Sequence, residues 1–149
     1  MVILGIDPGY ATVGCGVAEY SLNRFTLLGY GAIETKPHTP FNERLEKIYD
    51  QTAELIERFK PDAVSMEKLY FNSNQKTAID VSQARGVTVL AVQKHRIPLF
   101  EYTPLQVKQS VVGYGRADKH QVQEMVKLLL RLDTVPHHAL LDLQRRILK

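Results

Sequence analysis

Two acidic residues, each at the end of an apolar run, are the part of this sequence best suited to chemistry. The first run ends at Asp7, where Pro8-Gly9 turns the chain straight back into a second apolar run, and a later run ends at Glu67. A carboxylate is costly to leave in apolar surroundings unless something compensates its charge. Hard cations such as Mg²⁺ prefer oxygen ligands, and two such ions about 4 Å apart can activate a water and stabilise the leaving oxygen of a phosphodiester. The two acids together therefore predict a metal-binding pair.

Each acid also has a simpler explanation when it is taken alone. Asp7 could merely begin an Asp-Pro-Gly turn, which aspartate favours because its side chain hydrogen-bonds to the local backbone. Glu67 could be a solvated acid at the end of a strand. The metal-binding interpretation therefore depends on whether the fold brings the two side chains to one place.

The first half of the chain has the pattern of a sheet that could carry both acids. Residues 2–7, 12–20 and 25–34 are predicted strands, and the short connections between them predict an antiparallel meander. Apolar residues at helical spacing predict an amphipathic helix over residues 41–59, and a buried strand follows over residues 62–67. A strand reached through a long helix should lie parallel to its sheet neighbour.

The second half of the chain continues with alternating helices and strands. A helix is predicted over residues 75–94 and a strand over residues 97–102. Thr103-Pro104 is a typical helix start, with threonine as N-cap and proline at the first position, and Asp118 is the N-cap of a further helix. These elements predict the α/β class, with a mixed sheet, in a single domain over residues 1–149.

The composition sets the broad class of protein. The chain has 149 residues, of which 44% are hydrophobic and 23% charged, as in ordinary globular domains. Cys15 is the single cysteine, so an intrachain disulfide and a cysteine-based zinc site are excluded, and we expect it to fill the core. The start of the chain lacks a signal-like segment, and we expect a cytoplasmic protein. A net charge of +3 permits a polyanionic partner without requiring one.

Several motifs, in order along residues 1 to about 136, resemble the RuvC family of bacterial crossover junction endonucleases, or Holliday junction resolvases. These motifs are Asp7-Pro8-Gly9, Glu67 followed by Tyr70-Phe71-Asn72, Gln83-Ala84-Arg85-Gly86-Val87, and Gln106-Val107-Lys108-Gln109-Ser110-Val111-Val112-Gly113. The resemblance implies a ribonuclease H-like fold and Mg²⁺-dependent hydrolysis of two symmetric strands of a four-way DNA junction. It also implies a homodimer that works with the RuvA–RuvB branch-migration complex.

The resemblance assigns roles to five residues. Asp7 and Glu67 match the first two metal-binding acids of the family. Tyr70 matches an aromatic ring that stacks on an unpaired base, an interaction typically worth about 1–3 kcal/mol, although ordinary core packing would also explain a tyrosine there. Lys108 and Lys119 match lysines used near the scissile phosphate or along the DNA backbone.

The chain departs from the family pattern after Pro136. Leu140 and Leu143 stand where the family has its last acids, or a histidine and an acid, and leucine cannot ligate a metal. His138 and Asp142 are four residues apart, so on a helix they would share one face and could replace those ligands. The other interpretation is a solvated face, with the neighbouring leucines docked on the sheet.

Three functions therefore stay open at this point. The leading one is a junction-specific nuclease. The second is a dimer that binds junctions but turns over poorly, because its last ligands are altered. The third comes from the resemblance of residues 5–9 to the first phosphate loop of actin-like ATPases and sugar kinases.

Overall fold

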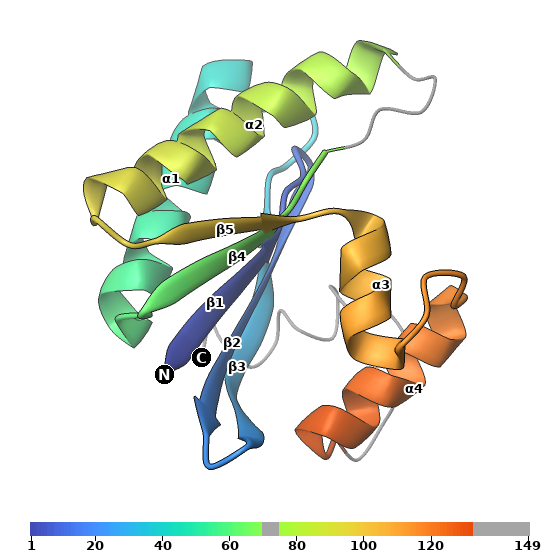
Figure 1. Ribbon diagram of the computed structural model, residues 1–149. Helices are drawn as coiled ribbons and strands as arrows, with labels where there is room; N and C mark the ends of the chain where they lie inside the picture. Colours follow the sequence, from blue (N-terminus) through green and yellow to red (C-terminus); the bar gives the residue numbers. More distant parts are fainter. Residues whose placement is uncertain (70–74, 133–149) are drawn as a thin grey trace.

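The computed structural model describes residues 1–69 and 75–132, which form a five-stranded mixed sheet with helices on both faces (Figure 1). The strands are β1 (Val2–Asp7), β2 (Thr12–Ser21), β3 (Arg24–Glu34), β4 (Ala63–Glu67) and β5 (Leu99–Tyr102). The helices are α1 (Phe41–Phe59), α2 (Gln75–Lys94), α3 (Pro104–Val112) and α4 (Lys119–Leu130).

The strand order is β3-β2-β1-β4-β5. The first three strands are antiparallel, whereas β4 is parallel to both β1 and β5. This arrangement confirms the predicted meander and the predicted parallel crossover. The last strand is shorter than expected, because residues 97–98 still belong to its connection: Arg96 has a φ of 59°, and the Ile97 N–H donates back to the Val92 carbonyl at 3.4 Å.

Capping side chains stabilise the starts of α3 and α4, the two helices that follow β5 in the chain. The Thr103 hydroxyl accepts from the Gln106 N–H at 3.1 Å, and the Gln106 side chain accepts from the Thr103 N–H at 2.9 Å. Asp118 and Gln121 make the same reciprocal pair at the start of α4. Both N-caps predicted from the sequence are therefore confirmed, and each is typically worth about 1 kcal/mol.

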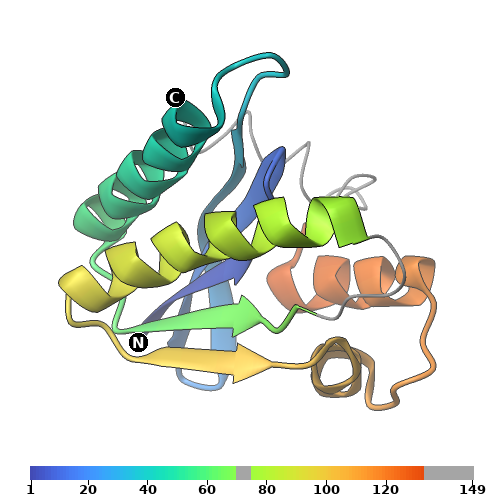
Figure 2. The same cartoon turned by 90° about the horizontal axis from the view of Figure 1, so that it is seen from above.

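The two faces of the sheet have different partners. One face packs against α1 and α2 through a buried core that includes Ile6, Met66 and Ile48. Side chains alternate between the faces of a strand, so the neighbours of Ile6 and Met66 point to the opposite face. On that side α3 contacts β5 and α4 contacts β3, and the two helices pack on each other (Figure 2). The side chains of Asp7 and Glu67 therefore belong to the α3/α4 side of the sheet.

Among the described residues, none of the helices has both the length and the apolar character needed to cross a bilayer.

Candidate metal and DNA site

Asp7 and Glu67 end neighbouring parallel strands at the same edge of the sheet. In the register of these strands, Ile6 lies opposite Met66, and each acid is the next residue along its strand. Both acids line one hollow of about 150 Å³, together with Pro8, Lys68, Leu69 and Pro104. The fold thus brings together two acids that are 60 positions apart in the sequence, while their role as metal ligands stays a prediction.

The electrostatics of this hollow disfavour two bare carboxylates. Asp7 is exposed at the surface, yet the protein atoms crowded around its carboxyl group remove enough water to raise its pKa. Burial also raises the pKa of Glu67, and the negative charge of Asp7 raises it further. The ammonium group of Lys108 partly offsets this by lowering the pKa of Glu67. A cation in the hollow would therefore relieve both the desolvation and the repulsion.

A tight turn holds Asp7 at the edge of the sheet. Pro8 is buried, and the backbone at Gly9 passes so close to the Thr12 carbonyl that a Cβ there would lie inside 3.0 Å of its oxygen. Real Cβ atoms essentially never come that close to another atom. The close backbone contact therefore requires glycine at this position. The Asp-Pro-Gly sequence had indicated only a preference for a turn.

Lys108 reaches the site from α3. The Thr103-Pro104 start directs this helix away from the end of β5, the strand beside β4, and Lys108 lies about one turn inside it, within electrostatic reach of Glu67. Lys119 is the first residue of α4 and is exposed. It is not among the described residues that line the hollow, although its helix packs on α3.

Other residues named from the sequence lie outside the described part of the chain. Tyr70 is one, and so are the four tail residues Leu140, Leu143, His138 and Asp142. Within residues 1–69 and 75–132, no group of three or more histidine, cysteine or acidic side chains could hold a metal ion. The described part of the site therefore offers two carboxylates.

Three residues that line the hollow were not singled out from the sequence as site residues. Lys68 and Leu69 directly follow Glu67 in the sequence, and this position next to a candidate ligand was the signal that could have identified them. Pro104 was expected only to start a helix. Its place in the site depends on β5 lying beside β4, which the residue pattern near Pro104 does not specify.

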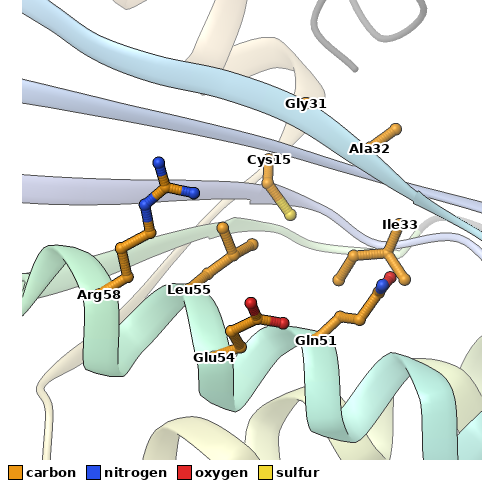
Figure 3. Close-up of a pocket in the computed structure, with 8 residues that line it drawn as sticks. All are labelled: Cys15, Gly31, Ala32, Ile33, Gln51, Glu54, Leu55 and Arg58. Atoms are coloured by element: carbon orange, nitrogen blue, oxygen red, sulfur yellow. The ribbon is translucent and has the colours of Figure 1, made fainter. Parts of the chain in front are cut away.

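A second hollow, between α1 and the β2–β3 side of the sheet, does not suit a substrate (Figure 3). It has room for about 20 Å³, close to the volume of a single water, and its walls are mostly apolar. Cys15 lies against it, and burial, followed by the charge of Asp7, raises the pKa of its thiol to about 12. Cys15 is 3% exposed, so the expectation of a core cysteine is confirmed.

Comparisons with known proteins agree with the sequence motifs. The family model for "Crossover junction endodeoxyribonuclease RuvC" matches residues 3–142. The RuvC of Ruminiclostridium cellulolyticum is 55% identical over 136 residues, which are 91% of this chain and 82% of the relative. The RuvC of Clostridioides difficile is 54% identical over the same length, covering 91% of this chain and 80% of the relative.

Solved structures show the same likeness. The structure described as T. thermophilus RuvC in complex with Holliday junction substrate has a TM-score of 0.89 and 34% identity, covering 96% of this chain and 88% of that chain. A yeast mitochondrial Holliday junction resolvase has a TM-score of 0.60 and 16% identity over 87% of this chain and 62% of that chain, which shows the shared fold alone. The predicted ribonuclease H-like fold is confirmed, and the comparisons favour neither of the two alternative functions. With a family model over nearly its whole length and relatives more than half identical, the chain belongs to the RuvC family of crossover junction endodeoxyribonucleases.

Proposed function

We propose that this protein is an endonuclease that resolves four-way DNA junctions in homologous recombination and DNA repair. The observation that carries the proposal is the meeting of Asp7 and Glu67 in one hollow, with Lys108 close to Glu67, in a chain of the RuvC family. Two acids at one strand edge can hold a cation of the kind that assists phosphodiester cleavage, and a lysine beside them can pair with a phosphate.

The donor chemistry of the hollow fits Mg²⁺. This ion is usually held by one or two carboxylates and keeps several waters, with substrate phosphates completing its ligands. Asp7 and Glu67 would be those carboxylates, and the raised pKa values of both acids show that the metal-free hollow holds negative charge at a cost. Bound there, the ion would activate a water and neutralise charge on the phosphate.

The protein's own side chains would place the DNA. Lys108, on the same side of the sheet as the two acids, would pair with the scissile phosphate and keep Glu67 ionised by lowering its pKa. Lys119, exposed at the start of α4, would contact the DNA backbone, and Tyr70 would stack on an unpaired base. Such contacts position the DNA but read little sequence, so junction shape would decide specificity.

The assembly follows from the symmetry of the substrate. A four-way junction presents two equivalent strands for cleavage, so we propose a homodimer with one site for each strand. We also propose that it acts in the bacterial cytoplasm with the RuvA–RuvB complex. The dimer can be tested by sedimentation of the protein with and without a synthetic junction.

Cleavage itself is tested by incubating the protein with a labelled four-way junction and Mg²⁺. We expect symmetric nicks with 5′-phosphate ends, no nicks from Asp7→Asn or Glu67→Gln, and wild-type junction affinity for both variants. Glu19→Gln, an exposed acid on β2 remote from the hollow, is the matched control and should cleave normally.

A different result would identify a binding protein without turnover. If the wild type shifts the junction on a gel but leaves no nicks, and Asp7→Asn behaves identically, the leucines at 140 and 143 have cost the chain its activity. Equal loss of affinity and cleavage in Glu67→Gln would instead contradict the assignment of Glu67 as a metal ligand.

A further inference from the structure

We infer that Arg44, on α1, is a positioning residue that holds the Asp7 turn in place through Thr35 and Tyr10. The inference rests on the proposed role of Asp7 as a metal ligand. It adds a residue that lies outside the hollow and outside the motifs that identified the family. The contacts that carry it join three separate segments of the chain: the β1–β2 turn, the end of β3 and the first turn of α1.

Thr35 ties the β1–β2 turn to the end of β3. Its backbone N–H donates to the Ala11 carbonyl at 2.9 Å, and its hydroxyl donates to the Tyr10 carbonyl at 2.7 Å. The residue is 5% exposed, so water competes little for these bonds. Thr35 thus holds two successive carbonyls of the turn that follows Asp7, one through its side chain and the other through its backbone N–H.

Arg44 completes this arrangement from α1. Its Nε donates to the Thr35 hydroxyl at 2.8 Å, and its guanidinium carbon lies 3.5 Å from the centre of the Tyr10 ring. The Tyr10 ring also packs against Phe41, with centroids 5.3 Å apart. Because a hydroxyl has one proton to give, the bond from Arg44 directs the Thr35 proton toward the turn.

These contacts bear on the metal ligand because Asp7 is the last residue of β1 and the clamped residues follow it within one short turn. Figure 1 shows the turn at the end of β1 beside the segment that joins β3 to α1. Removal of a group that orients a metal ligand typically lowers metal affinity by about 10–100-fold. We therefore assign to Arg44 an effect on Mg²⁺ affinity that exceeds its effect on DNA binding.

The Arg44→Lys variant separates the effect of the hydrogen bond and ring contact of Arg44 from the effect of its positive charge. It keeps the positive charge but lacks the Nε donor and the planar group that stacks on an aromatic ring. Thr35→Val removes the hydroxyl with little change of shape. Arg58→Lys is the matched control, because Arg58 lies near the other end of α1 and its guanidinium is also close to a ring, 5.2 Å from the centre of Phe59.

The test is a Mg²⁺ titration of the full chain, followed by thermal unfolding with the metal alone and by cleavage of a labelled junction. We expect the half-saturating Mg²⁺ concentration to rise about tenfold in Arg44→Lys and in Thr35→Val. The double variant should add little, since both changes break the same hydrogen bond. Arg58→Lys should stay within about twofold of the wild type, and metal-free junction affinity should be unchanged in all variants.

Amide hydrogen exchange gives a readout that needs no metal. Exchange at the amides of residues 9–12 should be faster in Arg44→Lys than in Arg58→Lys, because fewer contacts then oppose opening of the turn. Unchanged exchange, or an unchanged Mg²⁺ midpoint in Arg44→Lys while the wild type responds to Mg²⁺, would overturn the positioning role alone. A wild type that shows no Mg²⁺ response in either assay would refute the metal site itself, and the inference with it.

Discussion

Replacing Gly9 by alanine tests whether the tight turn after β1 sets the position of the Asp7 carboxylate. The added Cβ would fall well inside 3.0 Å of the Thr12 carbonyl oxygen, and it would also lie 3.1 Å from the carbonyl carbon. Both atoms belong to the backbone, so no side-chain rotation can relieve the clash. Restoring even a 3.0 Å separation requires the turn to open by about 1 Å, and a displacement of that size at a reacting group can cost about 100-fold in rate.

The same substitution has a stability cost that must be separated from the loss of rate. Forcing an extra methyl group into space that is already filled typically costs about 1–3 kcal/mol, and each kcal/mol lowers Tm by about 2–4 °C in a domain near this size. Asn23→Ala is a suitable control, since Asn23 has a φ of 58° in the turn at the other end of β2 and accepts a 2.7 Å bond from the Tyr20 hydroxyl. It should lower Tm while cleavage stays normal.

The assay is single-turnover cleavage of a labelled junction at saturating Mg²⁺, at least 10 °C below the Tm of the less stable variant. For a domain of this size, that interval corresponds to about 3 kcal/mol of free energy of unfolding, so both variants stay folded. Gly9→Ala should be slower than Asn23→Ala by about two orders of magnitude. If the two variants lose Tm to a similar degree and cleave at the same rate, the turn does not set the geometry of Asp7 and the reasoning fails.

Four further predictions concern charge and packing. In metal-free buffer Asp7→Asn should be more stable than the wild type, because burial raises the folded-state pKa of Asp7 above 3.8. The wild type therefore loses stability as pH rises from 3.8 through the folded-state pKa. The Tm difference between the two proteins should grow between pH 4 and pH 7. Mg²⁺ at ten times its Kd should stabilise the wild type by about 1.4 kcal/mol and leave Asp7→Asn unmoved; equal shifts would contradict the site. Lys108→Ala should weaken junction binding and reduce its salt dependence by about 0.9 log units for each phosphate that is no longer neutralised, and an unchanged slope would remove Lys108 from the DNA surface. Ile48→Ala, at a position that is 0% exposed beneath the sheet, should cost about 2–5 kcal/mol in urea unfolding, and a cost below 1 kcal/mol would show that α1 is not packed as described.

Much of the fold was predictable because its signals are local. The meander follows from three apolar runs joined by short connections, and the helix starts at Thr103 and Asp118 follow from capping chemistry within four residues. The strand boundary at residue 97 was wrong because the turn there is closed by a backbone bond from Ile97 to Val92, and a backbone bond has no signature in residue types.

The sequence by itself determined which side chains could do the chemistry and to which family the chain belongs. Asp7 with its Pro-Gly turn, Glu67 at the end of an apolar run and Lys108 after a capped helix start are all visible as residue types in order. Covalent order and local propensity suffice for this, because each signal lies within a few residues of the group concerned.

Only the tertiary structure decided which of these groups meet. The parallel register that pairs Ile6 with Met66 places the two acids side by side, and the packing of α1 sets Arg44 against Thr35 and Tyr10. A register shifted by one residue would send Glu67 to the other face of the sheet. Such choices are made by the packing of the whole core, whose contacts join residues far apart in the chain.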